Sequence, residues 1–273
     1  MCMHFFRRAS MVILFTAYSS VTAAVDGVSV PPLAKTVYEK LSIKQEFPRD
    51  KVETLIVKAD HAVVLIKQGT SESFSIQVMA QSWPKGIEIQ MFKSRNGKAL
   101  IVDGSAVPHK NLRIDYTIIV PKGVHIRLAG GIVEAVLEGI EGGDVFADVG
   151  RLILKSQGGF LSNFKGSAGE ATIDISAITK DFLLACGGGT IKVRYVLPEK
   201  AKKNGLQIGR MPTVTLRQGA GRALFSFPSF AAVSYKSFSG VTSSFLSDNK
   251  QYDIRCLFYT APGVQVGLSK DGP

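Results

Sequence analysis

The chain has 273 residues, including 27 glycines, 33 lysines and arginines and 22 aspartates and glutamates, and its formal net charge is +11 at pH 7. This length is sufficient to bury a sizeable core. No apolar run after the N-terminal segment approaches the roughly 18 residues that a membrane-spanning helix needs. The sequence therefore excludes a transmembrane class for the mature chain and predicts a soluble protein.

The first 24 residues have the three parts of a secretory signal peptide. Arg7 and Arg8 supply positive charge, Met11–Ala17 is apolar, and Thr22–Ala24 offers small residues for cleavage. We expect cleavage after Ala24 and export to the periplasm, the cell surface or the extracellular medium. A retained membrane anchor is the alternative, but the apolar stretch is short and is followed by polar residues.

The positive charge favours an anionic partner. Removal of residues 1–24, which hold two basic residues and no acidic one, leaves 31 basic and 22 acidic residues and a net charge of +9. These charges are dispersed, which is typical of a solvated surface, and only Lys200, Lys202 and Lys203 are clustered. The expected partner is an envelope component, an anionic surface or another protein rather than nucleic acid, and self-association is an open option.

Two cysteines remain after residues 1–24 are removed, Cys186 and Cys256. A pair in an oxidising compartment leaves a disulfide open, but one pair is not a disulfide framework. Cys186 continues the alternation of Phe182 and Leu184, which indicates a small buried hydrophobic residue. Neither the spacing nor the neighbouring residues suggest a metal site.

Residues 25–51 form an N-terminal arm, helical or extended, and residues 52–121 are predicted to be short antiparallel strands that cap the next segment. Turn residues separate apolar runs throughout residues 52–121, and Asn96-Gly97 is a strong hairpin signal. Such a cap covers the apolar cross-section at the end of a stack of repeats.

Residues 122–221 repeat a glycine and an alternating apolar pattern, and they predict a β-solenoid. Gly131, Gly150 and Gly169 are 19 residues apart, and Gly189 follows 20 residues later. Apolar or small residues occupy the second, fourth and sixth places after each glycine, which is the period of a strand. One repeat is too short to bury its own apolar face and needs a stacked neighbour. The fold class is therefore predicted to be all-β, a parallel β-helix or β-solenoid with rungs of about 19 residues.

Alignment of these glycines predicts which side chains share a column. Two inward columns are expected, with Val133, Leu152, Ala171 and Ile191 in one and Ala135, Leu154, Ile173 and Val193 in the other. The fifth place after each glycine is expected to point outward, with Asp174 between Lys155 and Arg194.

Residues 222–273 form an aromatic C-terminal cap followed by closing strands. Six aromatic residues occur among serines and small residues between positions 225 and 245, namely Phe225, Phe227, Phe230, Tyr235, Phe238 and Phe245. A cap over the last rung is favoured over an exposed aromatic patch for a ligand. The stretches at 252–258 and 264–268 predict a final rung with Pro262-Gly263 as its turn.

The order of these features resembles the bacterial putative-adhesin family of unknown function. The resemblance is carried by residues 118–124, Ile-Ile-Val-Pro-Lys-Gly-Val, which lead into the repeats, and by the glycine-started strands at 131, 150, 169 and 189. It extends over about residues 52–268 and implies a parallel β-helix with a cell-surface or adhesive role. It implies no catalytic residue.

No residue of the sequence is assigned a catalytic, cofactor-binding or metal-binding role. Asp144, Asp148 and Asp174 are the candidates for an enzyme that acts on polysaccharides, and Asp144 and Asp148 are four apart and point the same way in one strand. Glycosidase chemistry needs two carboxylates across a sugar bond, and no such pair is evident. The histidines at 61, 109 and 125 are scattered.

Two functional hypotheses follow. The favoured one is a non-catalytic exported β-solenoid that presents a repetitive surface to an envelope component or a partner protein, as an adhesin or scaffold. The alternative is a polysaccharide-active, pectin-lyase-like β-helix enzyme, which would need a groove lined by converging carboxylates.

Overall fold

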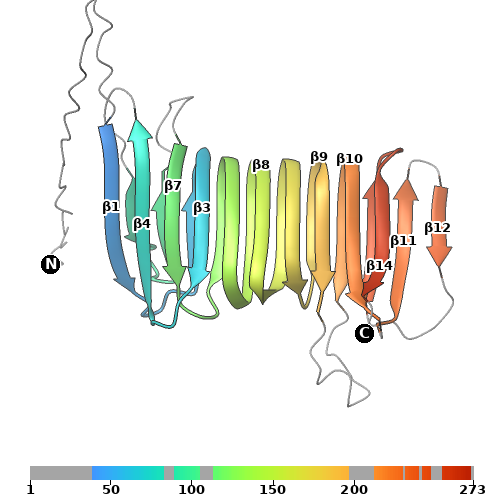
Figure 1. Cartoon of the computed structure of the whole chain (residues 1–273), viewed down its shortest axis with the longest axis horizontal. Helices are drawn as coiled ribbons and strands as arrows, with labels where there is room; N and C mark the ends of the chain where they lie inside the picture. The colour runs from blue at the N-terminus through green and yellow to red at the C-terminus, as the bar shows by residue number, and fades with distance from the viewer. Residues whose placement is uncertain are drawn as a thin grey trace, which may run out of the picture.

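The computed structural model describes residues 39–82, 89–104, 113–196, 212–229, 231–239, 242–246 and 254–271. Every regular element in these ranges is a β-strand, and together they form a 14-stranded mixed sheet (Figure 1). The prediction of an all-β class is therefore confirmed. The predicted signal peptide, residues 1–24, lies outside the described residues. No helix in the described ranges is long and apolar enough to cross a bilayer.

The strands are numbered in chain order. They are β1 (Glu39–Pro48), β2 (Thr54–Lys58), β3 (His61–Gln68), β4 (Ser73–Ser82), β5 (Gln90–Lys93), β6 (Ala99–Asp103), β7 (Arg113–Val120), β8 (His125–Ile178), β9 (Phe182–Tyr195), β10 (Thr213–Pro228), β11 (Val233–Ser239), β12 (Thr242–Leu246), β13 (Ile254–Thr260) and β14 (Gln265–Asp271). β8 covers 54 residues, and at about 3.3 Å per residue it would extend about 180 Å if it were straight. It instead turns back repeatedly, so that its segments lie side by side (Figure 1).

Most of the sheet is parallel. β8 pairs in parallel with β9, β9 with β10, and β10 with both β13 and β14. β2 pairs in parallel with β6 on one side and with the start of β8 on the other. β3 pairs in parallel with β7 on one side and with a later segment of β8 on the other. We call β2, β3, β6–β10, β13 and β14 the parallel stack. Antiparallel pairs lie at its two ends, β1–β4, β4–β7 and β5–β6 at one and β11–β12 at the other.

The expectation of antiparallel pairing throughout residues 52–121 is wrong for β2 and β3. These strands lie inside the stack, between β6–β7 and β8, although they precede β6 and β7 in the sequence. Parallel neighbours require a long connection, and the residues between β3 and β6, which include β4 and β5, supply it. The Asn96-Gly97 prediction is confirmed, because this turn joins the antiparallel pair β5 and β6 and Gly97 has a φ of 70°.

The core runs along the inside of the stack as one cluster of apolar side chains. All eight residues predicted to point inward are buried, namely Val133, Leu152, Ala171, Ile191, Ala135, Leu154, Ile173 and Val193. Alternate residues point outward, as the period of a strand requires. The closing strands are also confirmed, because β13 and β14 continue the stack on β10.

The predicted alignment of β9 is wrong by two residues. Ile173 lies opposite Ile191, and Ala171 lies opposite Gly189. Asp174 points outward as expected, but its neighbour on β9 is Lys192 rather than Arg194. Three consecutive glycines, 187–189, concealed the shift, because any of them could be aligned with Gly169.

Gly189 is required by the bend that it forms. Its φ is +135°, and a Cβ atom on it would lie 1.8 Å from the Ala171 carbonyl oxygen of the neighbouring strand. No other residue fits so close to a backbone carbonyl with this conformation. The bend therefore separates the two halves of β9 without interrupting their pairing with β8 and β10.

The two cysteines remain thiols, with Cys186 half-buried and Cys256 buried. Cys186 lies opposite Gln218 of β10, whereas Cys256 of β13 lies opposite Val214. The two residues are thus two strands and four positions apart, roughly 10 Å across and about 13 Å along the strands. A disulfide needs Cα atoms within about 7 Å, so the register forbids this pairing.

We expect Ile173→Asp to abolish stable folding, with a loss of about 4 kcal/mol or more in the free energy of unfolding. The substitution removes a buried side chain and places an unpaired carboxylate in the core. Thr172→Asp is the matched control, because Thr172 is exposed on the same strand. Urea unfolding followed by circular dichroism compares the two variants. Equal unfolding midpoints would contradict the inward placement of Ile173.

We also expect both thiols to react slowly in the folded protein. Burial raises the pKa of the Cys186 thiol to about 11 and that of the Cys256 thiol to about 12. At pH 8 a thiol of pKa about 11 has about a hundredfold less thiolate than one of pKa about 9, and the thiolate is the reactive form. Iodoacetamide labelling of protein lacking residues 1–24, followed by mass spectrometry, measures both rates. Cys186 labelling as fast in buffer as in guanidinium would refute this expectation.

Candidate functional site

The parallel stack has two outer faces. The β14 face consists of the outward side chains of β3, β7, β14, the second half of β9 and residues 222–228 of β10. The β13 face consists of those of β2, β6, β13, the first half of β9 and residues 213–218 of β10. Segments of β8 contribute to both. Because parallel pairing places equivalent residues side by side, each face carries rows of side chains that cross the strands.

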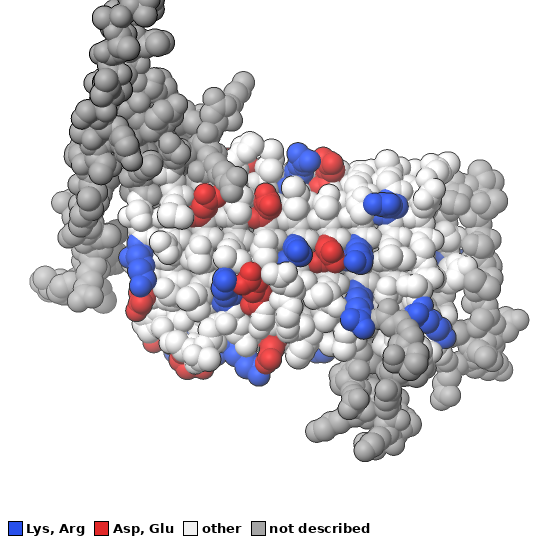
Figure 2. Space-filling model, viewed as in Figure 1, with Lys and Arg blue, Asp and Glu red and all other residues white. Residues whose placement is uncertain are grey.

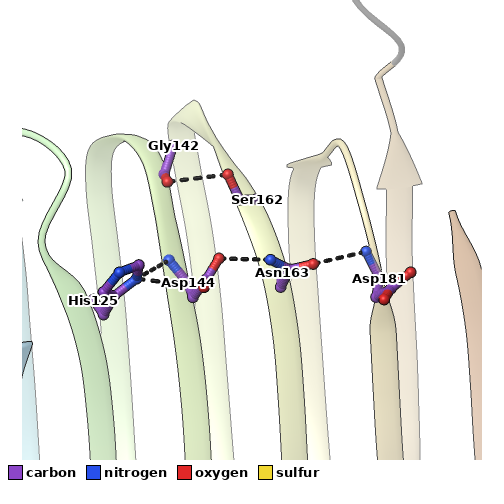
Figure 3. Close-up of polar contacts among 6 residues, drawn as sticks. All are labelled: His125, Gly142, Asp144, Ser162, Asn163 and Asp181. Carbon is purple, nitrogen blue, oxygen red and sulfur yellow. Dashed lines mark hydrogen bonds and ion pairs between the residues drawn. The ribbon is translucent and has the colours of Figure 1, made fainter. Parts of the chain in front are cut away.

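A row of polar contacts lies at the edge of the β13 face and joins consecutive strands (Figure 3). The Asp144 backbone N–H donates to Nδ1 of His125 at 3.3 Å, and Asn163 Nδ2 donates to Asp144 Oδ1 at 2.7 Å. The Asp181 N–H then donates to Asn163 Oδ1 at 3.1 Å, and the Thr213 N–H to Asp181 Oδ1 at 2.9 Å. We call these five residues the corner row. It holds neighbouring turns of the chain together.

The three aspartates proposed for an enzyme do not converge. Asp144 and Asp148 are on the β13 face, where Asp144 belongs to the corner row and Asp148 accepts a hydrogen bond from Ser167 Oγ at 3.3 Å. Asp174 is on the β14 face, next to Lys192 in the register. No single substrate can contact all three carboxylates, because the core separates the two faces.

The histidines are equally separated. His61 is exposed at the start of β3, His125 is in the corner row, and His109 lies outside the described residues. Within the described part of the chain, no group of three His, Cys, Asp or Glu side chains has an arrangement suited to a metal ion.

The aromatic residues of the C-terminal segment divide between the core and the surface. Phe225 and Phe227 are buried, but they lie in β10, which pairs with β9 on one side and with β13 and β14 on the other, so they belong to the core of the parallel stack rather than to the predicted cap over its end. Phe230 and the side chain of Phe245 lie outside what the structure describes. On the β13 face, Phe238 stacks on Tyr259 with ring centroids 4.8 Å apart, and Arg217 lies over the Tyr259 ring at 5.2 Å. Lys236 covers Phe238 at 4.7 Å. These rings are already stacked on neighbours, so they favour a structural role over an open ligand platform.

Acidic and basic side chains lie next to each other across most of the β14 face, and the side toward the C-terminal strands is mainly basic (Figure 2). Asp115 of β7 and Glu134 of β8 are near the N-terminal end of the stack, and Lys192 of β9 and Arg222 of β10 are near the C-terminal end. Some charges are paired, such as Lys67 with Glu138 at 2.7 Å, where the hydrogen bond from the Lys67 ammonium lowers the pKa of the Glu138 carboxyl. The C-terminal part of this face is therefore the more basic one.

A hollow of about 490 Å³ lies in this basic part, over β9, β10 and β14. Its lining residues are Thr190, Ile191, Lys192, Arg222, Ala223, Leu224, Gln265, Val266 and Gly267. Two rows cross it, Thr190–Arg222–Gln265 and Lys192–Leu224–Gly267. Gly267 of β14 has no side chain, so the last outward side chain of the second row is that of Leu224. The hollow therefore lies over the backbone of β14 at Gly267. We call this the β14 hollow, and it is the candidate binding site.

None of the hollow's residues was predicted from the sequence to be a binding residue. A weak signal existed, because Thr190 and Arg222 each follow a glycine of positive φ, Gly189 and Gly221. Each is therefore the first residue after the bend in its strand, β9 or β10, and both lie on the β14 face. The two-residue error in the alignment of β9 hid their pairing.

Several solved structures are distantly similar to this chain. A putative cell adhesion protein from Clostridium sporogenes is 12% identical, with a TM-score of 0.37 over 85% of this chain and 100% of that chain. A putative adhesin from Bacteroides fragilis is 12% identical, with a TM-score of 0.27 over 84% and 97%. A putative lipid binding protein from Parabacteroides distasonis is 8% identical, with a TM-score of 0.29 over 85% and 97%.

No protein-family model matches the chain, and no curated protein matches it significantly. The similar solved structures include putative adhesins from bacteria. Their TM-scores and identities are too low to assign a family or to transfer the role of any residue.

We expect Asn163→Ala to lower the free energy of unfolding by about 1–2 kcal/mol. The substitution leaves the Asp144 carboxylate and the Asp181 N–H without their partner in the corner row. Lys165→Ala is the control, since Lys165 is exposed two residues further along β8, and its effect should stay within about 0.5 kcal/mol. Urea unfolding measures both variants. Losses of equal size would show that the corner row does not stabilise the stack.

Proposed function

We propose that the chain is an exported, non-catalytic β-solenoid with rungs of about 19 residues, which acts as an adhesin or an envelope scaffold. The observation that carries this proposal is one contact spacing that recurs between Lys122 and Glu170, in β8 and just before it. Lys122 Nζ lies 2.7 Å from Glu141 Oε2, and Arg151 Nε lies 3.2 Å from Glu170 Oε2. The residues of each pair are 19 apart in the sequence, as are His125 and Asp144 of the corner row.

The shape of the stack suits attachment to a large partner. Adhesion requires a broad, rigid surface, and both outer faces consist of paired strands rather than of loops. Because adjacent strands are roughly 4.8 Å apart, outward side chains repeat at this interval across several strands. A partner that is itself repetitive, such as an envelope polymer, can contact many equivalent positions at once.

A non-catalytic role agrees with the positions of the acidic residues. Asp144 and Asp148 hold neighbouring strands through Asn163 and Ser167, and Asp174 is on the other face. The alternative, a polysaccharide-active enzyme, needs two carboxylates on either side of one sugar bond, and these three aspartates do not meet that requirement.

The proposed location is the periplasm or the cell surface, because residues 1–24 have the composition of a signal peptide. The net charge of +9 that remains after their removal favours an anionic envelope component as partner. The basic part of the β14 face is where such a component would bind.

An envelope pull-down tests the proposal. Immobilised protein lacking residues 1–24 is incubated with envelope extract in about 50 mM and about 500 mM salt, and a resin carrying lysozyme serves as a basic control. We expect envelope material to be retained on this protein but not on lysozyme, and most of it to be lost at high salt because screening weakens charge attraction. Retention no greater than on lysozyme would contradict an adhesive role.

A further inference from the structure

The two cations of the β14 hollow are available to a ligand. Lys192 and Arg222 are both exposed, and among the described residues neither forms an ion pair within 4.0 Å. Asp174 is beside Lys192 in the register without forming such a pair. Thr190 is opposite Arg222, so Lys192 and Arg222 are diagonal neighbours on adjacent strands, about 7–8 Å apart. Their long side chains can therefore reach one anionic group between them.

The other side chains of the hollow offer hydrogen bonds and a small apolar surface. Thr190 and Gln265 flank Arg222 in the same row, and each provides both a donor and an acceptor. Leu224 is 40% exposed at the centre of the second row, next to the bare backbone of Gly267. This combination matches a sugar that carries an acid group, because such a sugar has a carboxylate, hydroxyls that donate and accept, and an apolar C–H face.

We propose that the β14 hollow binds a carboxylate-bearing sugar unit of an acidic glycan, with Lys192 and Arg222 on the carboxylate and Thr190 and Gln265 on the hydroxyls. This inference rests on the proposed function and specifies its partner. Charge-assisted hydrogen bonds from Lys and Arg supply the affinity. Leu224 packs against the ring of the sugar.

Two other anionic partners fit the hollow less well. Single-stranded nucleic acid binds through aromatic side chains on which the bases stack, and no lining residue is aromatic. Binding to an anionic membrane surface uses several apolar side chains that enter the lipid, whereas Leu224 is the only exposed large apolar side chain of the lining. The hollow thus favours the glycan.

The test measures binding of polygalacturonate to the protein lacking residues 1–24, by calorimetry in about 50 mM salt. We expect the double variant Lys192→Gln/Arg222→Gln to bind about tenfold or more weakly, because two charged hydrogen-bond donors are removed. The control variant, Lys155→Gln/Arg127→Gln, removes one lysine and one arginine that are exposed outside the hollow. It lowers the net charge equally, and we expect a loss of less than about threefold from screened long-range attraction.

A third variant tests the shape of the hollow without changing its charge. Gly267→Leu places a side chain at the end of the row Lys192–Leu224–Gly267, where its Cβ atom would be 3.2 Å from Leu224 Cδ1, so the flexible tip of Leu224 must shift slightly. Gly267 is on an exposed strand and its φ is not positive, so the backbone tolerates the change. We expect this variant to keep the wild-type circular dichroism spectrum and to bind polygalacturonate at least about fivefold more weakly, because the sugar ring is excluded.

Several results would overturn the inference. Equal weakening by the two double variants would show that net charge, not the hollow, binds the glycan. Unchanged binding by Gly267→Leu would place the glycan elsewhere. Binding to phosphatidylglycerol vesicles or to single-stranded DNA, without binding to polygalacturonate, would identify a different partner. Retention of envelope material by a protein that does not bind polygalacturonate would refute the glycan and leave the adhesive role standing, whereas failure of both assays would refute both.

Discussion

The structure depends on parallel backbone pairing between segments that are a nearly constant number of residues apart. A strand as long as β8 can satisfy its backbone N–H and C=O groups only by pairing with itself and with its neighbours. Each bend must then lie directly against the bend of the next strand. At Gly189 and Gly221 a Cβ atom would be 1.8 and 2.0 Å from a carbonyl oxygen of the neighbouring strand. Close backbone contact at the bends therefore determines where glycine must occur and which residues face each other.

Parallel pairing also places equivalent side chains of neighbouring strands side by side, so that the alternation of inward and outward residues along each strand produces a core and two outer faces. Inward residues form one continuous core, and outward residues form rows that cross the strands. Where a row contains complementary groups, as in the corner row, it joins successive turns of the chain. Where a row contains a glycine at an outward position, as at Gly267, the surface is hollowed. The corner row, which stabilises the stack, and the β14 hollow, which is the candidate binding site, thus both result from the register of the parallel strands.

The distribution of charge on the surface matters more than the net charge. The excess of basic residues alone predicts only a general preference for anions. On the β14 face, however, Lys67 pairs with Glu138 and Arg151 with Glu170 across neighbouring strands. Such exposed pairs contribute little stability, typically below about 1 kcal/mol, but they neutralise the centre of the face. Lys192 and Arg222 form no such pair with any residue that the structure describes, and they are left as the positive part of the β14 hollow.

The sequence by itself determined the all-β class, the inward residues and several turns. These features are local: the side of a strand on which Ile173 lies follows from alternation alone, and Asn96-Gly97 specifies its own turn. Only the tertiary structure decided that β2 lies between β6 and β8 and that β3 lies between β7 and β8, because alternation does not reveal which strands are neighbours. It also decided the register of β9, which three glycines left ambiguous. The β14 hollow combines Thr190, Arg222 and Gln265, which come from three strands far apart in the sequence and meet only through backbone pairing.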